Sequence, residues 1–225
     1  TIDLLSDGRF MMGLGAGWMK EDYTITGITQ DDALTRIERL EEAITVMRGL
    51  WGAGPFSHEG RFYSVSEIDA QPKPISNIPI TVGGGGPKLL AMAARKADVV
   101  GINPKIVGRS INPRSMATAA ADVVDEKIGY VKAAAGDRFD QLELQLQVFA
   151  TVVTDDPMAV AEKMAPMFGL PPEVVLQAPY FQIGSVQQII DNITMLRERW
   201  GITYIAFQQD ATAAMAPVVA ALAGK

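Results

Sequence analysis

Apolar residues recur along the chain in two alternating patterns, short β-branched runs and longer segments with apolar residues three or four positions apart. The short runs predict strands, and the longer segments between them predict amphipathic helices. Strands that alternate with helices indicate an α/β protein with a parallel sheet and right-handed crossovers. Five strands leave two architectures open, a doubly wound sheet or part of a (β/α)8 barrel. The five runs lie near residues 10–14, 78–82, 98–102, 142–153 and 202–207.

Local signals sharpen several of these elements. Residues 31–51 predict a helix, and Ser185 with Gln188 predicts a capping box for a helix that Gly201 ends. A small hairpin is expected at residues 56–63, and a polar loop at 104–113 is a candidate lid. The strand predicted at 142–153 begins with polar residues at alternate positions, so we expect one wet side at its start.

The most informative stretch is a β-branched run that ends in four glycines and continues into an Ala/Leu-rich segment. This order predicts a strand, a tight turn and a helix N-terminus. The first N–H groups of a helix lack internal partners and lie at the positive end of its dipole, so the turn predicts a phosphate site. Glycine would permit close backbone approach and positive φ there. The alternative is a turn in which glycine only relieves strain. The residues concerned are Gly83, Gly84, Gly85, Gly86, Pro87 and Lys88.

A second glycine-rich segment follows the first predicted strand. Its G-x-G-x-G spacing, at Gly13, Gly15 and Gly17, matches a dinucleotide fingerprint only loosely. Because ligands of α/β proteins bind at the carboxyl ends of parallel strands, we expect both glycine-rich segments at that edge. Asn103 follows the strand predicted at 98–102. Two interpretations of this residue stay open, a ligand contact and an ordinary residue at the start of a loop.

Composition excludes several kinds of site and partner. The 225 residues carry a formal net charge of -6 without a basic stripe, which argues against nucleic acid. The chain has no cysteine and one histidine, which excludes thiolate and His-rich metal sites, and we expect His58 at the surface. No apolar run is long enough for a membrane span and no signal peptide is seen, so a cytoplasmic protein without a membrane partner is expected.

The start of the chain resembles the inside of a longer protein. It opens at Thr1, and residues 2–8 have the pattern of the last turn of a helix closed by a glycine. We therefore expect that an N-terminal part is missing.

Three segments together resemble the luciferase-like monooxygenase superfamily, and within it the oxidoreductases that depend on the deazaflavin coenzyme F420. These are residues 4–10, residues 13–18 with 21–23, and residues 82–87. The resemblance covers essentially the whole chain, including residues 36–42 and 183–185. It implies one (β/α)8 TIM-barrel domain over residues 1–225, truncated at its N-terminus, in which this chain supplies about strands four to eight.

The resemblance also implies a function, hydride transfer between reduced coenzyme F420 and a small organic substrate. An FMN-dependent monooxygenase that uses molecular oxygen and a non-catalytic truncated relative are the alternatives. Catalytic residues stay unassigned because the family places them on strands that this chain lacks. A homodimer of the full-length protein through outer helices is expected. The implied cofactor-binding residues are Gly15, Ala16, Gly17, Trp18, Gly83, Gly84, Gly85, Gly86, Pro87 and Lys88.

Overall fold

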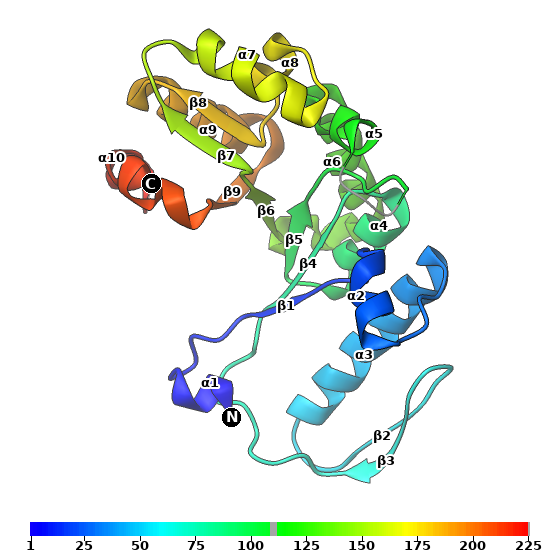
Figure 1. The fold of residues 1–225 in the computed structure, drawn as a ribbon. Helices are drawn as coiled ribbons and strands as arrows, with labels where there is room; N and C mark the ends of the chain where they lie inside the picture. Colours follow the sequence, from blue (N-terminus) through cyan, green and yellow to red (C-terminus); the bar gives the residue numbers. More distant parts are fainter. Residues whose placement is uncertain (109–111, 225) are drawn as a thin grey trace.

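The computed structural model describes residues 1–108 and 112–224 as an α/β protein built on a five-stranded sheet (Figure 1). Every pair of neighbours in this sheet is parallel. The alternation of strands and helices in the sequence therefore predicted the fold class correctly. The strands, in their order across the sheet, are β1 (Met12–Leu14), β4 (Ile80–Gly84), β5 (Val99–Ile102), β6 (Glu143–Gln147) and β9 (Ile202–Ala206).

The sheet is open. Strands β1 and β9 are its edges, each paired with a single neighbour, and the described residues form no closed barrel. The strands follow one another in chain order, which is also the order of consecutive strands in a (β/α)8 barrel. Strand direction and order thus agree with the (β/α)8 expectation, and the unpaired edges agree with an incomplete barrel. That the sheet is part of a truncated barrel stays a prediction.

A second, two-stranded parallel sheet corrects the prediction of one strand at 142–153. The chain changes partners in the middle of that stretch: the Val148 N–H donates to the Ala206 carbonyl, and the Phe149 N–H donates to the Tyr180 carbonyl. The predicted strand therefore divides into β6 and β7 (Ala150–Val153), and β7 pairs with β8 (Phe181–Gly184). The sequence interpretation assigned no strand at β8.

The predicted hairpin is present as β2 (Phe56–Glu59) and β3 (Ser64–Ile68), which are antiparallel. Of the predicted polar loop, residues 109–111 lie outside the described residues. The helices are α1 (Ile2–Leu5), α2 (Lys20–Thr26), α3 (Ala33–Trp51), α4 (Pro87–Lys96), α5 (Pro113–Met116), α6 (Ala121–Ala135), α7 (Pro157–Phe168), α8 (Pro172–Gln177), α9 (Val186–Trp200) and α10 (Thr212–Leu222), with short 3-10 turns η1 (Ala117–Ala119), η2 (Gly136–Gln141) and η3 (Gln209–Ala211).

Helix boundaries follow from local capping by side chains and glycine. Asp32 accepts hydrogen bonds from the Leu34 and Thr35 N–H groups at the start of α3. Ser185 and Gln188 form the predicted capping box of α9, and Gly201 ends that helix in the left-handed conformation. Helix α3 accordingly begins within two residues of the predicted start at residue 31.

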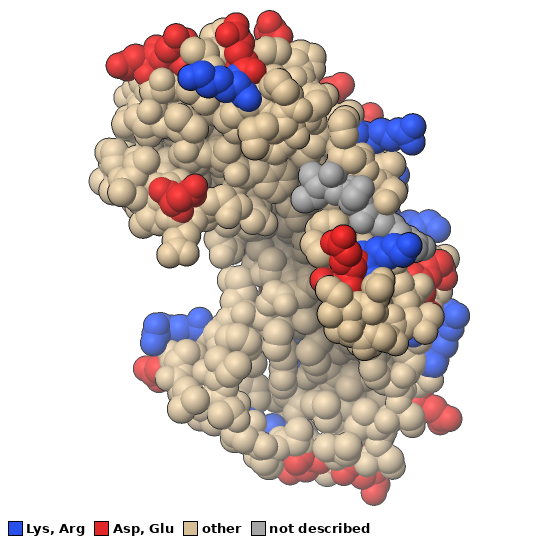
Figure 2. All heavy atoms as spheres, in the orientation of Figure 1, with Lys and Arg blue, Asp and Glu red and all other residues tan. Residues whose placement is uncertain are grey.

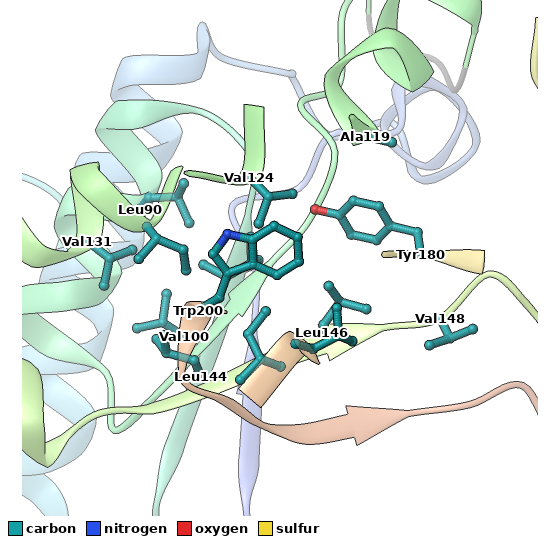
Figure 3. Close-up of a cluster of buried hydrophobic side chains, with 14 of the residues drawn as sticks. Leu90, Val100, Ala119, Val124, Val131, Leu144, Leu146, Val148, Tyr180 and Trp200 are labelled. Atoms are coloured by element: carbon teal, nitrogen blue, oxygen red, sulfur yellow. The ribbon is translucent and has the colours of Figure 1, made fainter. Parts of the chain in front are cut away.

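One face of the sheet packs against helices α3, α4 and α6, and this contact contains the main core (Figure 1). Alternate strand residues such as Ile80, Val82 and Leu146 are fully buried there. Figure 3 shows the Trp200 ring among Leu90, Val100 and Val124, so the end of α9 closes this core. A smaller cluster joins α9 to α10.

Strand β9 contains a β-bulge. Ile202 pairs with Leu144, but the next pair in register is Tyr204 with Gln145, which leaves Thr203 as an extra residue. Both Ile202 and Ile205 consequently lie toward the helices although they are three positions apart.

Across residues 1–108 and 112–224, every helix is too short or too polar to cross a membrane.

Candidate functional site

The face of the sheet opposite the helices, called here the inner face, carries glycines at neighbouring positions of three strands. Gly13 pairs with Thr81, Gly83 pairs with Gly101, and Gly101 pairs with Gln145. Paired residues in a parallel sheet point to the same side, and the neighbours Ile80 and Val82 face the helices. These glycines therefore line the inner face.

The inner face is open over β1. A Cβ atom added to Gly13 or to Gly15, which follows β1, would meet nothing within 4 Å. Farther along the sheet the glycines lie close together, since a Cβ on Gly101 would be 3.0 Å from the Gly83 Cα. Figure 2 shows a hollow on this side of the molecule whose visible wall is formed almost entirely by uncharged residues. We call Gly13, Gly15, Gly83 and Gly101 the glycine floor.

Polar side chains border this floor. The Gln145 Oε1 lies 2.8 Å from the position that a Cβ of Gly101 would take, and the Asn103 Nδ2 lies 2.8 Å from that of Gly83. The Oδ1 of Asn103 is buried and has no hydrogen-bond partner in the described part of the chain. A buried amide oxygen without a partner is costly, so this atom points to a ligand donor. The structure thus favours the ligand-contact interpretation of Asn103.

The four-glycine stretch, called here the glycine turn, has the predicted order of strand, turn and helix. Gly83 and Gly84 end β4, Gly86 is the N-cap of α4, and Pro87 is in its first turn. The expected positive φ is absent at all four glycines. Contact with other parts of the chain, and not positive φ, requires glycine at two of these positions, because a Cβ at Gly84 would lie 2.6 Å from Leu89, and one at Gly85 would collide with the backbone of residues 103–105. Gly86 alone has open space beside it.

The N-terminus of α4 has the properties of an anion site. Gly86 supplies no capping side chain, and Pro87 has no N–H, so the next backbone N–H groups of this ten-residue helix lie at the positive end of its dipole. Lys88 is exposed beside them. Sequence reasoning missed Lys105, an exposed residue whose backbone lies against Gly85. The sequence gives no sign that Lys105 lies near the glycine turn, because this proximity depends on a contact between two loops.

The other predicted segment, residues 15–18, lies at the same edge of the sheet. Leu14 pairs with Val82, so Gly15 follows β1 where Gly83 continues β4. The Arg36 Nε donates to the Ala16 carbonyl at 3.1 Å, which ties the segment to α3. Gly17 has a φ of 67°, and Trp18 is 37% exposed.

The structure therefore brings the two glycine-rich segments together, as the sequence predicted. Their binding of a cofactor stays a prediction.

Ionisable groups of the inner face include Tyr204, which pairs with Gln145, and Glu143. His58 lies elsewhere, on β2, with its Nε2 at 3.3 Å from Glu42 Oε1. Burial raises the pKa of Glu42, but hydrogen bonds from the Tyr63 and Phe62 N–H groups and from His58 outweigh this and lower it. Residues 1–108 and 112–224 contain no group of three His, Asp or Glu side chains that could hold a metal ion.

Comparison with known families agrees with this arrangement. Residues 1–173 match the model of the luciferase-like monooxygenase family. The chain belongs to this family. The sequence resemblance is thereby confirmed at the level of the family.

Characterised relatives of this luciferase-like protein differ in cofactor and reaction. The chain is 33% identical over 98 residues to the F420-dependent glucose-6-phosphate dehydrogenase of Microbacterium testaceum, which covers 44% of this chain and 29% of that protein. It is 31% identical over 161 residues to the pyrimidine monooxygenase RutA of Methylobacterium radiotolerans, which covers 71% of this chain and 40% of that protein. The luciferase-like chain thus spans less than half of either relative.

Solved structures of similar fold include an F420-dependent secondary alcohol dehydrogenase in complex with an F420–acetone adduct. Its TM-score is 0.69 at 18% identity, over 92% of this chain and 66% of that one. The EDTA monooxygenase of Chelativorans also has a TM-score of 0.69, at 14% identity, over 98% of this chain and 68% of that one. At such identities the likeness concerns the fold.

Proposed function

We propose that the full-length protein is an oxidoreductase that holds a flavin or deazaflavin on the glycine floor, with the cofactor's phosphate at the N-terminus of α4. The observation that carries this proposal is the side-chain-free surface at Gly13 and Gly15 beside a helix N-terminus without a cap. A flat ring system needs a flat surface, and a phosphate needs backbone N–H donors. One continuous edge of the sheet offers both.

Coenzyme F420 is the preferred cofactor, because both the sequence motifs and the dehydrogenase relative favour it. Bound there, it would supply hydride transfer to a small organic substrate. Residues of the chain orient the cofactor and exclude water from it: the glycine turn and Lys88 hold phosphate, residues 15–18 border the ring, and the Asn103 Oδ1 accepts a hydrogen bond from a ligand. The second candidate is an FMN-dependent monooxygenase, which the RutA match over 71% of this chain favours.

We propose further that additional strands of the full-length protein lie between β1 and β9 and complete a single (β/α)8 domain. Two observations support this, the open edges of the sheet and the coverage of only 66% of the F420-dependent alcohol dehydrogenase chain. A homodimer of the full-length protein is part of the same proposal. The exposed apolar residues Ile25 on α2, Ile28 in the following loop and Leu34 at the start of α3 support it.

Titration of the full-length protein with coenzyme F420 and with FMN, followed by fluorescence, tests the proposal. Affinity for F420, affinity for FMN and affinity for neither are distinct results, and the last would reject the proposal. Gly15→Val is the informative variant. Its side chain would enter open space, so the fold should stay intact, but it would cover part of the glycine floor. We expect at least tenfold weaker binding with unchanged thermal stability. Gly129→Val, at another glycine with open space, is a control for the added bulk.

A further inference from the structure

Lys127 is a lysine in the interior of the protein. It lies on α6, and 1% of its surface is exposed. Its Nζ donates a hydrogen bond of 2.6 Å to the Thr118 carbonyl and lies 5.8 Å from the centre of the Tyr180 ring. Burying an ammonium group is costly unless it makes such contacts. The position of Thr118, which accepts this hydrogen bond, indicates which part of the chain Lys127 stabilises.

Thr118 joins Lys127 to the loop that follows β5. The Thr118 hydroxyl accepts a hydrogen bond of 2.7 Å from the Lys105 N–H and donates one of 2.7 Å to the Ser115 carbonyl. The Ser115 hydroxyl in turn accepts from the Val107 N–H at 2.9 Å. The residue that receives the ammonium hydrogen bond thus also fixes the backbone at Lys105.

That backbone lies directly against the glycine turn. An added Cβ at Gly85 would collide with residues 103–105, and the Asn103 N–H donates to the Gly84 carbonyl at 2.9 Å. Contacts therefore run without a gap from Lys127 through Thr118 and Lys105 to Gly85. We propose that Lys127 is a positioning residue, which through Thr118 holds the loop that shapes the glycine turn for an anion.

The charge on Lys127 strengthens this contact. Burial lowers the pKa of Lys127 to about 8, while the neighbouring Glu126 acts in the opposite direction. Tyr180, whose ring lies next to the ammonium group, stays neutral because burial raises its pKa. A hydrogen bond from an ammonium group is about twice as strong as one from a neutral donor. The turn should therefore loosen as the pH rises from 7 to 9.

Hydrogen exchange of the full chain without ligand tests the positioning role by itself. Lys127→Met and Thr118→Val should each raise amide exchange at residues 83–86 and 103–107 by roughly tenfold or more, because each breaks one link. Thr118→Ser keeps the hydroxyl and should exchange like the wild type. Lys132→Met, an exposed lysine of the same helix, is the control. Unchanged exchange in Lys127→Met overturns the inference, whatever Thr118→Val does. If Lys127→Met does not fold, exchange at residues 83–86 in the wild type at pH 7 and 9, corrected for the intrinsic pH dependence of exchange, decides, and equal protection at the two pH values overturns the inference.

Binding of inorganic phosphate and of coenzyme F420 tests the consequence for the site, which rests on the proposed function. We expect Lys127→Met to bind each about tenfold more weakly at pH 7 while its melting temperature stays the same or rises. Wild-type affinity should fall between pH 7 and 9, and that of Lys127→Met should not. If the wild type binds neither probe while exchange changes as stated, the proposed function fails and the positioning role stands. If the wild type binds and Lys127→Met binds equally well, the positioning role is wrong.

Discussion

The indole N–H of Trp200 donates a hydrogen bond of 2.6 Å to the carboxylate of Asp125, which ties the end of α9 to α6. Trp200 is 3% exposed and belongs to the main core. The same carboxylate also accepts two hydrogen bonds from Arg199, at 3.1 and 2.5 Å.

Replacing Asp125 by Ala should therefore destabilise the protein. The variant leaves a buried indole N–H without a partner, at a cost of about 1–3 kcal/mol. Urea unfolding at pH 7 measures it, with Glu162→Ala, an exposed carboxylate of α7, as the control. Hydrogen bonds from Arg199 and Trp200 lower the pKa of Asp125, so its stabilisation is present above pH 3.8 and is lost as the pH falls through the lowered value. Equal unfolding midpoints for the two variants would contradict this account.

The glycines of the turn should differ in their tolerance of substitution. Gly85→Ala places a Cβ against the backbone of residues 103–105, so we expect a loss of about 1–3 kcal/mol in stability, typical of overpacking. Gly86→Ala enters open space at a φ of -101°, so it should cost less than Gly85→Ala, only the few tenths of a kcal/mol to about 1 kcal/mol by which Ala is a poorer N-cap than Gly. Thermal unfolding of the two variants, measured side by side, provides the comparison. Equal stability of the two variants would mean that the backbone of residues 103–105 does not restrict the side chain at position 85.

The pH dependence of stability should show the buried Lys127. Because its pKa is about 8 in the folded protein and 10.5 in the unfolded chain, the unfolded chain binds more protons between these values. Stability contributed by this group is therefore present above pH 10.5 and is lost as the pH falls through 8. Subtracting the unfolding free energy of the wild type from that of Lys127→Met, at each pH from 7 to 10.5, isolates the effect. We expect this difference to shrink as the pH rises, and a constant difference would refute it.

The two edge strands should limit the solubility of the chain by itself. Unpaired N–H and C=O groups of β1 and β9 are templates for aggregation. Adding an N-terminal segment of about 100 residues, enough to complete a typical barrel, should improve both solubility and cofactor affinity. Light scattering at matched concentrations of the short and the extended chains checks this. A short chain that stays monodisperse and gains nothing from the extension would argue against additional strands at these edges.

Local rules in the sequence predicted most elements of the fold. The strand before the glycine turn, helix α3 and the capping box of α9 each depend on neighbouring residues, and each was located correctly. The division at Val148 was missed because it depends on which distant carbonyl groups receive two successive N–H groups. Strand β8 was missed for the same reason, since its partner β7 was interpreted as part of another strand.

The candidate site was predicted in position and only partly in mechanism. Glycine-rich segments after two strands placed it at the correct edge of the sheet. The positive φ expected at Gly84 and Gly85 was wrong, and the close contacts of these glycines with Leu89 and with residues 103–105 were not foreseen, because they depend on parts of the chain that meet only in the fold. Close approach of the glycines to a phosphate stays a prediction. Lys105 and Lys127 are linked to the turn through hydrogen bonds to Thr118, and no spacing in the sequence predicts those bonds.

The bulge at Thr203 gives strand β9 one residue more than its neighbour requires. Without that residue, Ile202 would precede Tyr204 directly, and Ile205 would still return to the helical side by ordinary alternation. Deletion of Thr203 should therefore leave every other side chain of β9 on its present face of the sheet. Deletion of Tyr204 would instead remove a residue from the inner face. Thr203 is thus the position at which strand β9 can lose a residue during evolution while its remaining side chains keep the same faces of the sheet.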